Sequence, residues 1–196
     1  MLHKLLLVLL LSFTVGHSSC SPGTPEADNI SVRSATTPAF LTVADMRPAP
    51  KIHWLTIEQA EEKLKQEPRK VLVDVYTDWC GWCKKMDKST FTDPEVVALI
   101  NKNFYAVKLD AEGDRPITIK GQTFTFKPEY KAHELAVALL NGQMSFPTTV
   151  YLDEQLNMLT PVPGYLDAKN MSSILRYFGE NHHQMMTWQE FEKTTK

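Results

Sequence analysis

The hydrophobic and polar positions after residue 50 indicate helices that alternate with strands. Residues 56–66 carry an apolar stripe at helical spacing, and Thr56 with Gln59 forms a capping-box pattern at their start. Val71–Tyr76 is a β-branched run typical of a strand buried on both faces, and Phe104–Asp110 has the pattern of a second strand. We therefore expect one helix before the first strand and further helices between the two strands.

Two helices are predicted between these strands. One begins at Cys80, directly after the first strand. The other follows Asp93, which has the character of an N-cap and precedes Pro94 at the first helical position. Strands that are joined by helices in this way run parallel and connect through crossovers. The first half of the domain is therefore predicted to be α/β with a parallel sheet.

The second half begins with a different pattern. Ile117–Phe126 alternates around a glycine and predicts a β-hairpin. Glu129–Leu140 predicts a helix that ends at an Asn-Gly pair. Within this helix, His133 beside Glu134 is interpreted as a surface pair.

The remaining elements return the chain to the sheet. Phe146–Leu152 predicts a strand that is entered through a proline, and Met158–Tyr165 predicts its antiparallel partner. Asp167 is expected to cap a last long helix, and a second capping box, Thr187 with Glu190, predicts a further helical turn. The tryptophan and phenylalanine of that turn are expected to fold back onto the core.

The chain has 196 residues and a formal net charge of −2; 43% of its residues are hydrophobic and 22% are charged, as in a soluble globular protein with one core. This composition excludes a disordered or collagen-like chain. The mild acidity and the lack of a basic stretch argue against nucleic acid as a partner. The sequence has no phosphate-binding glycine loop and no Ser-His-Asp spacing, so no cofactor is expected and any chemistry should lie with the cysteines.

The first residues have the pattern of an export signal and a linker. In residues 1–19, Lys4 precedes the apolar run Leu5–Leu11, which is typical of a secretory signal and too short to span a bilayer. Residues 20–50 hold prolines among Ser, Thr and Ala, which predicts a flexible tether or an incidental disordered terminus. The folded domain is then expected to comprise residues 51–196.

Cys20 follows two serines at the end of this signal and resembles the lipobox cysteine of bacterial lipoproteins, which is lipidated and becomes the new N-terminus. His17 departs from that pattern, because the family usually has an aliphatic residue at this place. Lipidation at Cys20 is one expectation, and cleavage that leaves a free thiol is the other. The protein is expected to be exported to the periplasm or bacterial cell envelope, with membrane contact only through this anchor.

Cys80 and Cys83 stand at the predicted start of a helix, so both lie on one face within reach of a disulfide. The helix dipole and free backbone N–H groups lower the pKa of a thiol in such a position. We expect Cys80 to be the exposed nucleophile and Cys83 to resolve the mixed disulfide. A zinc site is the alternative, but a structural zinc ion requires four ligands and the chain has no further cysteine besides Cys20, so no metal is predicted.

The segment Val73–Lys84 resembles the active-site strand and helix of thioredoxins. The resemblance implies that Asp74 is the family's buried acid, which assists proton transfer to the resolving cysteine. A strand-end residue hydrogen-bonded to backbone is the alternative. It also implies that Lys108 is the strand lysine beside this acid and that Phe146-Pro147 is the cis-proline loop facing the cysteines. The expected fold is thioredoxin-like α/β: a central mixed sheet flanked by helices, with an inserted hairpin and helix before the cis-proline strand.

The resemblance also implies a substrate-binding surface. A cis-proline turns the preceding backbone outward, where it can pair with an extended substrate strand. Trp82, between the cysteines, is expected to be exposed, whereas Trp79 is expected to pack against the sheet. The predicted substrate-binding residues are Trp79, Gly81, Trp82, Phe146 and Pro147.

The segment 111–146 is longer than in minimal thioredoxins. In this respect the chain resembles exported thioredoxin-like proteins of bacterial envelopes, including the C-terminal domain of membrane thiol:disulfide interchange proteins. The resemblance implies an enzyme that reduces disulfides of envelope proteins, with protein substrates and a membrane or envelope electron donor as partners. A disulfide oxidase or isomerase is the nearest alternative. The alternatives from other classes are a copper metallochaperone that uses the cysteine pair with His182 or His183, and a non-catalytic scaffold domain.

Overall fold

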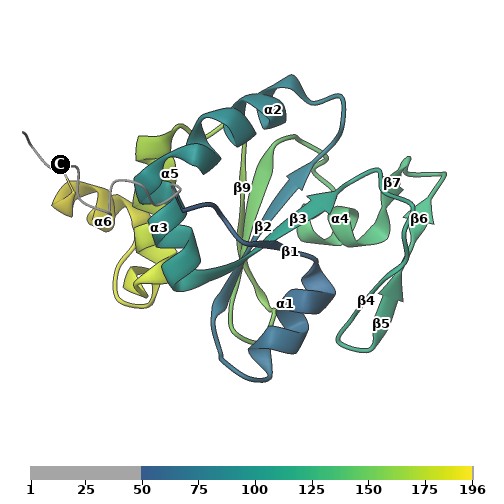
Figure 1. Ribbon diagram of the computed structural model, residues 1–196, viewed down its shortest axis with the longest axis horizontal. Coiled ribbons are helices and arrows are strands. Elements are labelled where there is room, and N and C mark those ends of the chain that lie inside the picture. Colours follow the sequence, from purple (N-terminus) through teal and green to yellow (C-terminus); the bar gives the residue numbers. More distant parts are fainter. Residues whose placement is uncertain (1–49, 196) are drawn as a thin grey trace, which may run out of the picture. The chain divides into compact units, whose positions relative to one another are not determined.

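The computed structural model describes residues 50–195. In chain order, the elements are β1 Trp54–Leu55, α1 Ile57–Leu64, β2 Lys70–Tyr76, α2 Gly81–Lys88, η2 Thr90–Thr92, α3 Pro94–Asn103, β3 Phe104–Asp110, β4 Ile117–Ile119, β5 Gln122–Phe124, β6 Phe126–Lys127, β7 Ala132–His133, α4 Glu134–Leu139, β8 Thr148–Leu152, β9 Met158–Pro163, α5 Ala168–Gly179, η3 His182–Gln184 and α6 Trp188–Thr194. Five strands form one sheet in the order β1-β3-β2-β8-β9, with helices on both faces (Figure 1). Two short ladders, β4-β5 and β6-β7, belong to the inserted segment.

Strand β2 lies at the centre of the sheet. It runs parallel to β3, with Asp74 opposite Lys108, and antiparallel to β8, with Asp74 opposite Thr149. β1 is parallel to β3, and β9 is antiparallel to β8. A parallel first half and an antiparallel second half are therefore confirmed. The sequence pattern does not predict β1, because its two residues are too few to show a period.

The sheet separates two hydrophobic cores. Side chains alternate along a strand, so Leu72 of β2 faces the core built with α3 and α5, whereas Val71 and Val73 face the core built with α1 and α4. Both faces of β2 are thereby covered. This explains why the strand is apolar almost throughout rather than alternating with polar residues.

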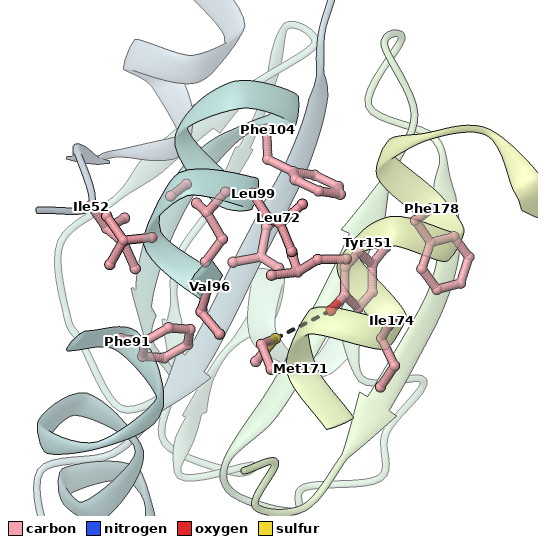
Figure 2. Close-up of a cluster of buried hydrophobic side chains, with 14 of the residues drawn as sticks. Ile52, Leu72, Phe91, Val96, Leu99, Phe104, Tyr151, Met171, Ile174 and Phe178 are labelled. Carbon is pink, nitrogen blue, oxygen red and sulfur yellow. Dashed lines mark hydrogen bonds between the residues drawn. The ribbon is translucent and has the colours of Figure 1, made fainter. Parts of the chain in front are cut away.

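Tyr151 of β8 lies inside the first of these cores (Figure 2). Its ring is fully buried, stacks on Phe178 of α5 with ring centroids 4.6 Å apart, and meets Phe104 edge-on at 5.9 Å. Its hydroxyl donates a hydrogen bond to the sulfur of Met171 at 3.6 Å, drawn as the dashed line in Figure 2. A buried hydroxyl thus keeps a partner, and these contacts fix α5 over β8.

The predictions for the C-terminal part are confirmed. Asp167 caps α5, and Thr187 with Glu190 forms the capping box of α6. Phe191 of α6 is buried in the first core, and Trp188 packs against it. The segment after α5 therefore extends the core.

The hairpin of the inserted segment is confirmed, but the helix after it is shorter than predicted. Lys120-Gly121 joins β4 to β5, and its φ angles of 52° and 74° suit a two-residue hairpin turn. The helix expected over Glu129–Leu140 begins only at Glu134, because the residues before it pair as β6 and β7. Such short strands carry no periodicity that a sequence pattern can reveal.

His133 is not the surface residue that the sequence pattern suggests. Its side chain is 1% exposed, and its Nδ1 accepts a hydrogen bond from the backbone N–H of Leu135 at 3.2 Å as the N-cap of α4. Its Nε2 lies 3.1 Å from the carbonyl oxygen of Arg115. Because a carbonyl only accepts and an amide N–H only donates, the ring carries its proton on Nε2. The interpretation of His133 and Glu134 as a surface pair is therefore wrong.

The predictions for the N-terminal segments concern residues 1–19, Cys20 and residues 20–50. Apart from Pro50, these lie outside the described residues and stay predictions. Between residues 50 and 195, no helix is long and apolar enough to cross a membrane.

Gly179 ends α5 where this helix packs against α3. A Cβ atom at this position would lie 2.9 Å from both Asn103 Cβ and Phe104 Cε2. Gly179→Ala is therefore expected to lower the free energy of unfolding by about 1–3 kcal/mol, although alanine is the better helix former. Denaturant titration of the oxidised protein measures the change.

Gly81→Ala is the matched control for this prediction. Apart from its two chain neighbours and the backbone of α2, no atom of residues 50–195 lies within 4 Å of a Cβ built at Gly81, so this variant should lose no stability. Equal losses in the two variants would contradict the steric explanation.

Candidate active site

Cys80 and Cys83 form a disulfide at the start of α2, with an S–S distance of 2.10 Å. Cys80 is the N-cap of the helix, and its sulfur accepts a hydrogen bond from the backbone N–H of Cys83 at 3.0 Å. Gly81 is the exposed first residue of α2, and a short turn connects it to Tyr76 at the end of β2. The predicted pairing of the two cysteines at a helix start is confirmed.

Cys80 is less accessible than expected. Its exposed fraction is 4%, and that of Cys83 is 3%. The prediction of an exposed nucleophile is therefore wrong for the oxidised state, in which the Cys80 sulfur lies against the first turn of α2 and is bonded to Cys83. The first turn of α2 contains no acidic residue, so the positive end of the helix dipole stays available to a thiolate in the reduced state.

An aspartate and a lysine meet on neighbouring strands on the sheet face that α2 covers. The Nζ atom of Lys108 donates a hydrogen bond to Asp74 Oδ2 at 2.6 Å and another to Asp87 of α2. The side chain of Asp74 is 2% exposed, that of Lys108 23% and that of Asp87 44%. One ammonium group thus connects a buried carboxylate to a surface carboxylate.

The structure brings together Asp74 and Lys108, as the sequence suggested, and adds Asp87. The sequence reasoning missed Asp87. It follows Cys83 by four residues, which places both on one face of α2 and is a signal that could have identified it.

The pKa of Asp74 is raised. Burial is the main cause; the attraction of Lys108 opposes the rise, and the carboxylate of Asp87 adds to it. Burial acts to lower the pKa of Lys108, but Asp74 and Asp87 outweigh burial and raise it. Asp74 Oδ1 has no hydrogen-bond partner among residues 50–195. Asp74 can therefore accept a proton at a higher pH than an ordinary aspartate, while Lys108 keeps its own.

Aromatic rings hold Lys108 in place beside a cleft. Its Nζ atom lies 4.9 Å from the centroid of the Trp54 ring, 5.2 Å from that of Tyr76 and 5.3 Å from that of Phe91. Such contacts stabilise an ammonium group. The cleft has a volume of about 530 Å³, and Lys108 and Asp87 are among the residues that line it.

The peptide bond between Phe146 and Pro147 is cis, as the resemblance implied. The carbonyl oxygen of Pro147 accepts a hydrogen bond from the N–H of Gly164 at 2.8 Å. The backbone of Phe146 makes no such bond within the described part of the chain. Its N–H and C=O groups can therefore pair with an extended segment of another protein.

Trp79 is exposed instead of packed on the sheet. It is 66% exposed, its indole N–H is 3.0 and 3.1 Å from the two carboxylate oxygens of Glu112, and its ring meets Phe146 edge-on at 5.9 Å. The expectation for Trp79 is wrong because Glu112, near the start of the inserted segment, gives the indole a partner at the surface. Trp82 is 56% exposed, as predicted, and its ring lies 5.3 Å from that of Tyr165. Sequence reasoning identified neither Glu112 nor Tyr165.

The sequence and the fold both match known proteins. Residues 57–179 match the family model described as a thioredoxin-like domain. The chain belongs to this thioredoxin-like family. The solved structure of a DsbH oxidoreductase shares the fold, with a TM-score of 0.50, 19% identity, and coverage of 68% of this chain and 90% of that chain. The expected mixed sheet flanked by helices is therefore confirmed as thioredoxin-like.

Similar proteins include thiol:disulfide interchange proteins. The protein DsbD of Haemophilus influenzae (strain PittEE) is 29% identical over 122 residues, which are 61% of this chain and 18% of that protein. DsbD of Haemophilus ducreyi is 45% identical over 42 residues, which are 21% of this chain and 7% of that protein. The chain thus spans less than a fifth of the length of these relatives.

The two histidines considered for copper lie in η3, after α5. The ring of His182 packs against Phe191, and that of His183 packs against Phe178. Burial lowers the pKa of His183. Among residues 50–195, no group of three or more His, Cys, Asp or Glu side chains could hold a metal ion.

Asp74→Asn removes a carboxyl group whose pKa is raised in the folded protein. The folded state binds this proton more tightly than the unfolded state, so Asp74 makes wild-type stability fall as the pH rises from the ordinary aspartate pKa of 3.8. The free energy of unfolding of the variant, relative to wild type, should therefore increase as the pH rises above 3.8 and stay constant at lower pH. Denaturant titrations of the oxidised proteins at a series of pH values measure the difference.

Asp153→Asn provides a control of opposite sign. Burial acts to raise the pKa of Asp153, but hydrogen bonds donated by Asn157 and Gln155 outweigh it, and the pKa is lowered. This variant should therefore lose stability, relative to wild type, as the pH rises toward 3.8, and the difference should stay constant at higher pH. The same trend in Asp74→Asn would show that the pKa of Asp74 is not raised.

Proposed function

We propose that this protein is a thiol:disulfide oxidoreductase that reduces disulfides of other proteins through Cys80 and Cys83. The observation that carries the proposal is a disulfide at a helix start, on the sheet face that buries an aspartate of raised pKa. Cys80 suits the role of nucleophile because it lies at the positive end of α2. Asp74 suits the role of proton acceptor for Cys83, and Lys108 orients its carboxylate.

The proposed reaction begins from the reduced protein. The Cys80 thiolate attacks one sulfur of a substrate disulfide and displaces the other as a thiolate, which leaves a mixed disulfide. Cys83 then transfers its proton to Asp74 and attacks the Cys80 sulfur. The second substrate thiolate leaves, and the Cys80–Cys83 disulfide forms. Two electrons pass from the cysteine pair to the substrate, and Asp74 returns its proton to solvent.

Substrate contact is proposed for the residues around the disulfide. The exposed rings of Trp79 and Trp82 offer apolar surface beside the cysteines, and the backbone of Phe146 offers N–H and C=O groups that no backbone group of residues 50–195 pairs with. Gly81 is exposed between the cysteines and carries no side chain, and Pro147 is proposed to contribute through the cis bond that precedes it. An extended segment of a partner protein is the substrate that these features suit.

The direction of exchange is part of the proposal. Reduction is favoured by resemblance to thioredoxins in three residues: the tryptophan before the first cysteine, the buried acid and the strand lysine. An oxidase or isomerase would use the same site with a different redox poise. The reduction potential of the cysteine pair separates them, because thioredoxin lies near about −270 mV and strongly oxidising relatives near about −120 mV.

Cys80→Ser is expected to lower the protein's catalysis of insulin reduction by dithiothreitol at least about a hundredfold, because no thiolate remains to attack the substrate. Cys83→Ser should instead accumulate a mixed disulfide with insulin that is visible on non-reducing gels. Turbidity of the released insulin chain measures the rate. Cys20→Ser is the matched control and should retain full activity. A wild-type protein without activity would favour the scaffold alternative.

We also infer that the protein is exported to the bacterial envelope, is lipid-anchored at Cys20 and receives electrons from a membrane donor. The apolar run after Lys4, the cysteine that follows it and the similarity to thiol:disulfide interchange proteins support this. Cys20→Ser is expected to abolish incorporation of labelled fatty acid and to move the protein out of the membrane fraction. Undiminished labelling of this variant would contradict the anchor.

A further inference from the structure

Two exposed tryptophans lie beside the disulfide, and each contacts another aromatic ring and one charged side chain. Trp79 contacts the ring of Phe146 and donates its indole hydrogen bond to Glu112; these three residues are called the Trp79 arm. Trp82 contacts the ring of Tyr165, and Lys85 Nζ lies 4.7 Å from the Trp82 ring and 5.0 Å from the Tyr165 ring. Trp82, Tyr165 and Lys85 are called the Trp82 arm. In each arm an aromatic ring and one charged group fix an indole at the surface.

The Trp79 arm is acidic. Asp78 directly precedes Trp79 and is exposed, and Asp110 accepts a hydrogen bond from the backbone N–H of Glu112 at 2.9 Å. The nearby Arg115 is engaged by Glu58, whose carboxylate it contacts at 2.6 Å. The negative charge beside Trp79 is therefore available to a partner.

The Trp82 arm is basic. Helix α2 presents Lys84, Lys85 and Lys88 to solvent. The acidic residue of this helix, Asp87, is bound by Lys108. In Figure 1, α2 extends to the left from its first turn, while α4, β6 and β7 of the inserted segment lie to the right. Trp79 and the exposed Asp78 directly precede Cys80, whereas Trp82 and the exposed lysines belong to the helix that Cys80 caps, so acidic and basic residues flank the disulfide along the chain.

We propose that the two arms select the charges on either side of a substrate cysteine. The occupant is an extended segment of a partner protein that carries a basic residue against Glu112 and an acidic residue against Lys85. The proposal rests on the proposed function and specifies its substrate class. Exposed ion pairs of this kind contribute about twofold to fivefold each, and the effect weakens with salt.

Two peptide substrates of equal composition test this proposal. They are the disulfide-linked dimers of Lys-Ala-Cys-Ala-Glu and of Glu-Ala-Cys-Ala-Lys, both with blocked termini. The reduced protein gives two electrons to either dimer, which releases two peptide thiols and leaves the Cys80–Cys83 disulfide. Chromatography of the released peptide gives the second-order rate constant of this single turnover, and the ratio of the two rate constants is the polarity preference.

The wild-type protein is expected to prefer one dimer by about fivefold at low salt, and the preference should approach unity at high salt. The double variant Glu112→Lys/Lys85→Glu should reverse it. Because the readout is a ratio within one variant, a general loss of activity does not affect it. Glu112→Gln keeps an acceptor for the Trp79 indole and removes the charge, so it should reduce the preference by about half.

The matched control is Glu62→Lys/Lys65→Glu, which inverts an exposed ion pair at the C-terminal end of α1. Its preference should equal that of wild type. Equal rates for the two dimers in wild type, or a preference that the double variant leaves unchanged, would overturn this inference and leave the proposed function standing. Failure of wild type to reduce either dimer would overturn the proposed function as well.

Discussion

Strand β2 buries Asp74 because β3 and β8 occupy both of its edges and helices cover both of its faces. Water is thereby kept from the carboxylate, and the loss of hydration raises its pKa. Lys108 lies opposite Asp74 on β3 and donates a charge-assisted hydrogen bond to one carboxylate oxygen. This bond reduces the free-energy cost of burying the charged carboxylate. On an edge strand the same aspartate would be hydrated and would titrate as an ordinary acid.

The same strand also positions the sulfur chemistry. The chain leaves β2 at Tyr76 and enters α2 after a short turn, so the free N–H groups of the helix lie at the end of the strand that carries the acid. Asp87 then extends from α2 back to Lys108. The disulfide at the start of α2, Asp74 of β2 and Lys108 are therefore fixed relative to one another by a strand, a helix and one shared ammonium group.

The inserted segment serves both the core and the surface. Leu135 and Ala136 of α4 complete the second core, and β6 and β7 fix the start of that helix. Glu112, near the start of the insertion, holds Trp79 at the surface next to the cysteines. A segment that covers the sheet thus also changes the charge of the face on which substrates are proposed to bind.

The sequence alone determined the features that depend on neighbouring residues: the central strand at Val71–Tyr76, the helix that begins after Cys80 and the caps at Asp93 and Thr187. Caps and periodic stripes are interactions within a few residues, so their signals are local. The resemblance to thioredoxins identified Asp74 and Lys108 as candidate site residues.

Only the tertiary structure decided the contacts between distant segments. Trp79 is exposed because Glu112, beyond β3, accepts its indole hydrogen bond, and His133 is buried because β7 pairs with β6. Lys108 contacts Asp87 because α2 folds over β3. Each of these positions depends on where another part of the chain lies, and no local pattern records that.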